Sequence, residues 1–214
     1  MTSSIVLKLT GIVKSNPFAL ISPYRPCLSL DILCPDHNQG QLVKPHKVDI
    51  KEYPLTVYVV AGTQAPKQNE NAIYYMKWTH LHKTRYDDDS QVLDEEDLDN
   101  DAEAALQILP IRHNSSINRI RAMNNSSIVA LWDETGSVSI YDGTKHTQVL
   151  VEYDEELAEL EEEETGKKKE GLKAPKDKNN FLLSQFQHSS EGYALTWSPH
   201  VLGNFGDFQE KINI

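Results

Sequence analysis

Long apolar stretches are missing from this sequence. No window approaches the roughly 18 uninterrupted apolar residues that a membrane-spanning helix needs. The start of the chain, residues 1–13, is apolar but contains Lys8 and Gly11, and no small-residue cleavage pattern follows it. We therefore expect neither a signal peptide nor a membrane anchor.

Cysteine is almost absent too, since only Cys27 and Cys34 are present. Two cysteines are too few for the disulfide framework of a secreted domain, which favours a reducing compartment, cytosol or nucleus. Their spacing from each other and from nearby histidines does not match a zinc signature, so we expect no metal site. His80 and His82 lie two apart on an expected strand, where they either chelate a metal or simply end an exposed strand.

The sequence also lacks the common catalytic motifs. It contains no phosphate-binding loop, no dinucleotide-binding fingerprint and no G-x-S-x-G nucleophile elbow. The overall composition, 39% hydrophobic and 25% charged residues, is ordinary for a soluble globular protein. We therefore expect a folded binding protein that has no cofactor and no catalytic residues.

Lysine and arginine are missing from two segments that hold most of the negative charge. Residues 87–103 contain ten acidic residues and residues 152–164 contain nine, whereas the rest of the chain has 13 acidic against 21 basic residues. Such segments repel nucleic-acid phosphates and attract proteins rich in lysine and arginine. The candidate partner-binding residues are Asp87, Asp88, Asp89, Asp94, Glu95, Glu96, Asp97, Asp99, Asp101, Glu161, Glu162, Glu163 and Glu164.

Each charged segment also has a simpler interpretation. The first acidic run is equally explained as a solubilising linker. In the second, the simpler interpretation is that Leu157 and Leu160 dock a helix on the body of the protein. The lysines at 167–178 are either a nuclear-import signal or a counter-charge to the glutamates before them. The sequence alone leaves these alternatives open.

Short apolar runs rich in Val, Ile, Leu and Tyr dominate the rest of the chain and predict an all-β protein. The expected strands are Cys27–Leu33, Leu55–Ala61, Ile73–Leu81, Ile117–Met123, Ile128–Trp132, Val138–Tyr141 and Tyr193–Trp197. Residues 133–136 read as a hairpin connection in which Gly136 supplies a positive φ. Only Asp154–Glu164 has a helical pattern.

A repeat organises these strands. Moving residues 119–140 forward by 74 positions places Met123 on Trp197, Asp133 on Asp207 and Val138 on Ile212 without a gap. Removing the acidic helix and the lysine-rich stretch, about 30 residues, restores the 40 to 45 residues of a propeller blade. The expected divisions are 1–24 as an N-terminal segment, 25–86 as the first blade, 87–110 as an acidic linker, 111–150 as the second blade, 151–180 as an acidic helix and linker, and 181–214 as part of a third blade.

The fold class that this pattern predicts is an incomplete β-propeller of about two blades and part of a third. Its last repeat stops before the position that matches Tyr141 and Asp142, the aromatic-Asp end of a blade. Asp133 and Asp207 are expected at turns between strands, and Trp197 within the repeat. His188 precedes the last repeat and is expected to form hydrogen bonds within a blade.

These stretches resemble the glutamate-rich WD-repeat proteins, which are related to the nuclear histone-binding WD-repeat chaperones. The resembling stretches are residues 26–32, 53–65 with its Ala-Gly-Thr-Gln sequence, 76–78, 117–121 and 191–199. An acidic insert between the first two blades also fits this family. The chain departs from the family at Arg25, where a Trp is usual, and at Gln187, where a Gly precedes the repeat histidine.

The resemblance implies a non-catalytic scaffold, monomeric in the intact protein, that acts in the nucleus and nucleolus. It implies a role in ribosome biogenesis as a chaperone that escorts a basic large-subunit ribosomal protein, with the acidic segments neutralising the charge of that partner. Histones are the alternative basic partner. A third interpretation is a protein-interaction scaffold of the substrate-receptor type, whose acidic loops only increase solubility.

Overall fold

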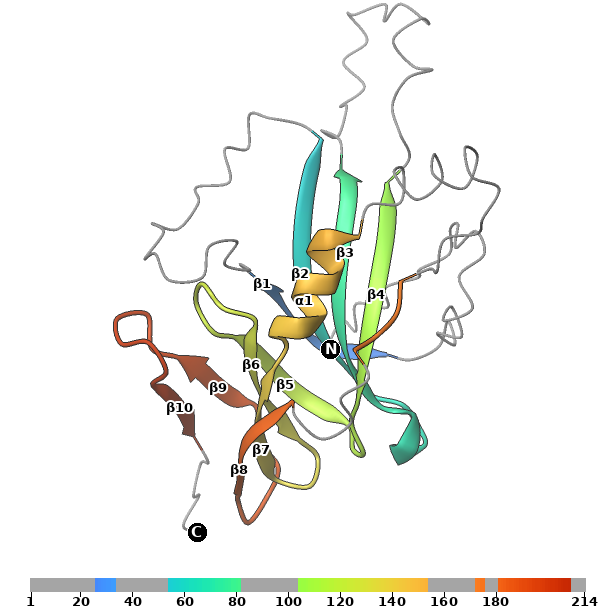
Figure 1. Ribbon diagram of the computed structural model, residues 1–214. Helices are drawn as coiled ribbons and strands as arrows, with labels where there is room; N and C mark the ends of the chain where they lie inside the picture. Colours follow the sequence, from blue (N-terminus) through green and yellow to red (C-terminus); the bar gives the residue numbers. More distant parts are fainter. Residues whose placement is uncertain (1–25, 34–53, 82–103, 154–171, 176–180, 209–214) are drawn as a thin grey trace, which may run out of the picture.

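The computed structural model describes residues 26–33, 54–81, 104–153, 172–175 and 181–208. These ranges form three antiparallel sheets, a short 3₁₀ helix and one α-helix, α1 (Figure 1). The first sheet has the order β1 (Cys27–Leu33), β2 (Leu55–Thr63), β3 (Ala72–Leu81), β4 (Ala105–Arg112). The second has the order β5 (Ile117–Ala122), β6 (Ile128–Asp133), β7 (Ser137–Asp142), β8 (Leu182–Gln187). The third pairs β9 (Ala194–Trp197) with β10 (Phe205–Phe208), η1 covers Gln68–Glu70, and α1 covers Thr144–Glu152.

The main core lies between the first and second sheets. Alternate residues of the strands point into it, because successive side chains of a strand face opposite sides of the sheet. Val60 and Ile73 come from the first sheet, Ile120 and Leu131 from the second, and all four are fully buried. Burying a side chain of this size contributes about 1.5–3 kcal/mol. The two sheets therefore hold each other through their apolar faces.

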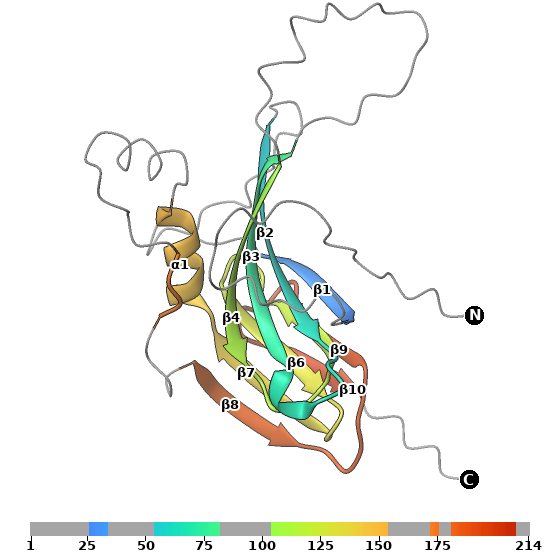
Figure 2. The same cartoon turned by 90° about the vertical axis from the view of Figure 1, so that its right-hand side faces the viewer.

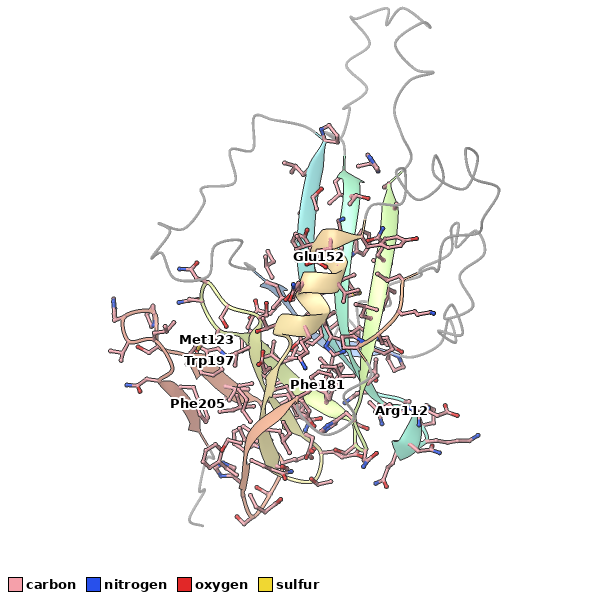
Figure 3. All side chains as sticks on the ribbon, in the orientation of Figure 1. Arg112, Met123, Glu152, Phe181, Trp197 and Phe205 are labelled. Carbon is pink, nitrogen blue, oxygen red and sulfur yellow. The ribbon has the colours of Figure 1, made fainter. Side chains whose placement is uncertain are left out.

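A second core lies between the second and third sheets. It contains Trp132 and Val138 from the second sheet and Leu195 and Trp197 from β9, all buried. Figure 3 shows Trp197 next to Met123, with Phe205 on the same side of the molecule. The sheets thus follow one another along the chain, each packed face to face on the next, as blades of a propeller do.

The first strands of neighbouring sheets are also joined by polar contacts. Ser29 Oγ lies 3.0 Å from Ile120 N, from which it accepts a hydrogen bond, and 3.3 Å from Ile120 O, to which it donates. Asp31 accepts a hydrogen bond of 3.0 Å from Ala122 N. These contacts fix β1 against β5, the first strand of each sheet.

The all-β architecture predicted from the sequence is confirmed, and each of the seven expected strands is present within two residues of its predicted ends. The hairpin at residues 133–136 is also present, with Gly136 at φ 83°. Three strands were not expected: β4, which begins inside the expected acidic linker, β8 and β10.

The prediction that only Asp154–Glu164 is helical is wrong, because α1 lies at Thr144–Glu152, in a stretch that was assigned to the second blade. Residues 154–164 themselves lie outside the described residues. Figure 2 shows α1 and β8 on the side of the molecule opposite β1. Within the described ranges, no helix has the length and apolar character that crossing a membrane requires.

Candidate functional site

Asp133 is the centre of a buried polar network at the end of β6. Its Oδ2 accepts a hydrogen bond of 2.7 Å from Ser115 Oγ and lies 3.2 Å from His113 Nε2. Its Oδ1 accepts bonds from the backbone and hydroxyl of Thr135 and from the backbone N–H of Ser137. One carboxylate therefore joins the end of β6, the turn that follows it and the link between the first two sheets.

The network lowers the pKa of the Asp133 carboxyl group. Burial alone would raise the pKa of this carboxyl, but the hydrogen bonds from His113, Thr135, Ser115 and Ser137 outweigh burial and hold the pKa well below the usual 3.8. Asp133 is thus ionised, and its charge is satisfied inside the molecule. The arrangement organises the turn and leaves no carboxylate oxygen free for an external ligand.

His113 and Ser115 were not predicted from the sequence, although the sequence contains a signal for His113. The 74-residue repeat, extended backwards, places His113 on Gln187, next to the expected repeat residue His188. His113 also contacts Tyr141 through a 3.2 Å approach of Nδ1 to the tyrosine hydroxyl. A histidine ahead of a strand is a weak signal alone, and only its position in the repeat distinguishes it.

The residues expected at the end of the second blade lie at the end of β7. Tyr141 packs edge-on against His113, with ring centroids 6.1 Å apart. Asp142 Oδ1 accepts hydrogen bonds from the backbone and the hydroxyl of Thr144, at 2.9 and 2.6 Å. Asp142 therefore stabilises the turn that leads from β7 into α1.

Of the residues expected in the third blade, two contact the second sheet and one lies in a strand instead of a turn. His188 stacks on Trp132 of the second sheet, with ring centroids 4.7 Å apart, and Trp197 Nε1 donates a 2.9 Å hydrogen bond to Arg121 O. Asp207 lies within β10 opposite Leu195, which differs from the turn position expected for it. The connection 198–204 is longer than its counterpart 123–127, and this difference shifts β10 along β9.

The acidic residues proposed as partner-binding all fall outside the described residues. Asp87, Asp88, Asp89, Asp94, Glu95, Glu96, Asp97, Asp99 and Asp101 belong to the connection between β3 and β4, and Glu161, Glu162, Glu163 and Glu164 to the connection between β7 and β8. The two connections occupy equivalent places, between the third and fourth strands of successive sheets. The structure therefore describes the elements that border each acidic segment: β3 and β4 for the first, and α1 and β8 for the second.

α1, which precedes most of the second acidic segment, lies on the two strands that border the first. The helix follows β7 but packs against β3 and β4 of the first sheet, and its Leu150 is fully buried in the main core. Lys77 of β3 donates a 2.9 Å hydrogen bond from Nζ to the carbonyl of Tyr153, directly after the helix. In Figure 3, Glu152 at the end of α1 lies over the upper part of the first sheet.

Of the two histidines considered as a chelating pair, only His80 lies within the described residues. His80, at φ 55°, interrupts the regular alternation of β3, and His82 lies outside the described residues. In the part of the chain that the structure describes, no group of three His, Cys, Asp or Glu side chains is arranged to hold a metal ion.

Comparison with known proteins gives three relatives. The chain is 37% identical over 175 residues to glutamate-rich WD repeat-containing protein 1 of Dictyostelium discoideum, a match that covers 75% of this chain and 32% of the relative. It is 28% identical over 180 residues to the ribosome assembly protein rrb1 of Schizosaccharomyces pombe, covering 81% and 32%. It is 32% identical over 209 residues to the protein Heat Stress Tolerant DWD 1 of Arabidopsis thaliana, covering 88% and 40%.

No family model matches the chain. The chain spans about a third of the length of the relatives that it matches, and none of the three names is that of an enzyme. The matches nevertheless extend over three quarters or more of the chain, and the structure supplies consecutive antiparallel sheets packed face to face. On this evidence the chain belongs to the glutamate-rich WD-repeat proteins, and its three sheets are blades of a partial WD-repeat propeller.

Proposed function

We propose that this chain is the part of a ribosome-assembly factor that binds a basic large-subunit ribosomal protein and shields its charge. The observation that carries the proposal is the equivalent placement of the two acidic segments, one in the connection between β3 and β4 and one in the connection between β7 and β8. A lysine- and arginine-rich protein is attracted to such segments. Each contact between exposed charges is weak and is screened over about 8 Å, but many contacts together produce a net attraction.

The names of two relatives support the ribosome-assembly part of this proposal. One of them is named a ribosome assembly protein and another a glutamate-rich WD-repeat protein. The WD-repeat body then serves as a rigid carrier of the acidic segments, with no catalytic step. Because ribosomal proteins join precursor ribosomes in the nucleolus, the proposal places the intact protein in the nucleus and nucleolus.

The test is a pull-down from cell extract at low and high salt. The protein is compared with a variant in which the ten acidic residues of segment 87–103 are changed to Asn and Gln, and with a second in which the nine of segment 152–164 are changed. We expect the unaltered protein to retain a large-subunit ribosomal protein at low salt and the variants to lose it.

The other outcomes separate the alternatives. Retention of histones in place of a ribosomal protein would support the histone-chaperone function. Recovery of the same partners by all three proteins would mean that the acidic segments are only solubilising linkers and that the chain is an interaction scaffold.

A further inference from the structure

Two buried N–H donors lack an acceptor where the second sheet packs on the third. They are Arg119 Nε of β5 and Trp132 Nε1 of β6, and within the described residues neither has a hydrogen-bond partner. Arg119 and Trp132 lie opposite each other in the antiparallel pair of β5 and β6, so their Cβ atoms are about 5 Å apart on one face of the sheet. A buried N–H without an acceptor is costly, and two at one place indicate that an acceptor belongs there.

The face that carries both donors is the one that meets β9. Trp132 forms a core with Leu195 and Trp197 of β9, and β9 contacts both β5 and β6 (Figure 1). Arg121 is paired with Ala130 of the same core and therefore lies on the same face as Arg119. Two guanidinium groups thus follow each other along β5, with their Cα atoms about 7 Å apart.

The positive charge of these two arginines is only partly balanced by the described residues. The ion pairs among those residues do not include Arg119. Arg121 Nη1 lies 3.9 Å from Asp31 Oδ2, an oxygen that already accepts a 3.0 Å hydrogen bond from a backbone N–H. Glu191 is bonded through Oε2 to Asn118 Nδ2 at 2.9 Å and forms no ion pair with Arg119. An anion would therefore find uncompensated positive charge here.

The loop before β9 covers the indole of Trp132 without bonding to its N–H. The His188 ring stacks on the indole, with centroids 4.7 Å apart. Gly192 lies so close that an added Cβ would be 2.5 Å from Cζ2 and 2.7 Å from Cε2, the carbon that carries Nε1. The two arginines are less covered, since Arg119 is half-buried and the side chain of Arg121 is 26% exposed. The buried donors therefore adjoin an accessible, positively charged surface.

We propose that Arg119, Arg121 and Trp132 form a binding site for a phosphate group. Arg119 Nε and Trp132 Nε1 donate to one phosphate oxygen, and Arg121 balances the second negative charge. A phosphate monoester carries up to two negative charges and three strong acceptor oxygens, which match two guanidinium groups and N–H donors that lack an acceptor. A carboxylate carries one charge and would leave the second guanidinium group uncompensated. The site consists of described residues and does not depend on the acidic segments or on the proposed function.

The indole N–H of Trp132 reports occupation of the site directly. The chain has three tryptophans, Trp78, Trp132 and Trp197, so Trp132→Phe identifies the Trp132 signal in a proton–nitrogen NMR spectrum. Inorganic phosphate is titrated into the chain at constant ionic strength, with chloride as the comparison. We expect phosphate, and not chloride, to shift the Trp132 indole proton downfield, because this proton gains a hydrogen bond.

Arg119→Lys tests the guanidinium group, because it keeps the charge and removes the Nε donor. Arg112→Lys is the matched control, since Arg112 is an exposed arginine at the end of β4. Arg119→Lys is expected to weaken phosphate binding about tenfold through loss of a charge-assisted hydrogen bond, and the control is expected to change nothing. The indole signal of Trp197, whose Nε1 donates a 2.9 Å bond to Arg121 O, shows whether β9 still packs on β5. If Arg119→Lys disturbs that signal, Arg121→Lys is expected to weaken phosphate without doing so.

The remaining outcomes are separate. A Trp132 signal that stays in place at millimolar phosphate, or moves equally with chloride, would overturn the site. Equal phosphate affinities of Arg119→Lys and Arg112→Lys, with the Trp197 signal intact, would overturn the role of Arg119. A short phosphoserine peptide distinguishes two sources of the phosphate group. Tighter binding of the peptide than of inorganic phosphate assigns the site to a phosphorylated protein, and equal binding assigns it to free phosphate.

Discussion

A single carboxylate, Asp133, holds together parts of the chain that lie up to 24 residues apart, from His113 to Ser137. It does so from a position that is almost fully buried. A buried charge is tolerated only when its hydrogen-bonding capacity is satisfied, and here two hydroxyls, two backbone N–H groups and an imidazole supply that. Asp133 therefore acts on stability and not on chemistry.

Replacing this carboxylate with an amide is expected to destabilise the protein. Asp133→Asn should lower the free energy of unfolding by about 2–4 kcal/mol, because the amide nitrogen cannot accept the bonds that the carboxylate accepts. Urea unfolding at pH 7 measures this change. Glu134→Gln, at the exposed next position, is the control and should change stability by less than about 0.5 kcal/mol.

His146 gives a separate dependence on pH. Burial lowers the pKa of this imidazole from 6.5 to about 4, against a smaller opposing effect of Asp142. Between pH 6.5 and 4 the unfolded chain binds a proton that the folded chain excludes, so stability falls as pH falls through this range. His146→Phe should flatten that part of a stability–pH curve.

The contribution of Asp133 to the free energy of unfolding is present above about pH 4 and is lost only below it, because the pKa of this carboxyl in the folded protein is depressed from 3.8.

At the scale of elements, α1 depends on close approach to β3. A Cβ atom on Gly143 would overlap the ring of Tyr75, which is itself fully buried and cannot move aside. Gly143→Ala should therefore loosen the start of α1 and cost about 1–3 kcal/mol in thermal or urea unfolding. Gly206→Ala is the matched control, since nothing lies within 4 Å of its added Cβ. Equal stability of the two variants would contradict this account of the helix.

A strand or helix could be predicted from the sequence where its own residues carry the pattern of apolar and polar side chains that is typical of that element. Alternating apolar residues predicted seven strands, because each of these strands has at least one face in a core. β4 was missed because Pro110 interrupts a strand that lies at the edge of its sheet, where proline is tolerated. α1 was missed because its sequence is rich in Thr and Val and gains its helical state from burial of His146, Thr147 and Leu150.

The residues of the candidate site could also be predicted only where the local sequence identifies them. The turn at Asp133 was evident from the residues themselves, whereas the partners His113 and Ser115 come from before the preceding strand, and folding alone brings them to the carboxylate. Lys77 likewise carries no sequence signal, since its role depends on a carbonyl 76 residues away.

At the scale of the whole molecule, the second and third sheets leave apolar side chains uncovered. Leu183 and Phe186 of β8 are 54% and 46% exposed, and Leu202 before β10 is 74% exposed. Neighbouring blades normally cover such faces, so we expect the chain to be marginally stable and to associate in solution. Light scattering and thermal melts measure both properties.

Polar replacements test the cause of that association. Leu183→Gln combined with Leu202→Gln should reduce self-association without lowering the melting temperature, because neither side chain is buried. The same exchange at buried Leu195 is the contrasting control, and it should lower the melting temperature by several degrees. A cooperative melt at high temperature in the unaltered chain, without association, would contradict the expectation of marginal stability.

The contacts between β1 and β5 have a consequence for how the sequence can vary. Ser29 and Asp31 bind backbone groups of Ile120 and Ala122 and not their side chains. Any residue other than proline offers the same N–H at positions 120 and 122, so exchanges on β5 leave these contacts intact, whereas exchanges at Ser29 or Asp31 remove them. The one printed side-chain contact of β5 here is the guanidinium of Arg121, 3.9 Å from Asp31 Oδ2. Apart from Arg121, the junction between the first two blades therefore constrains β1 more than β5, which can diverge within the limits of packing.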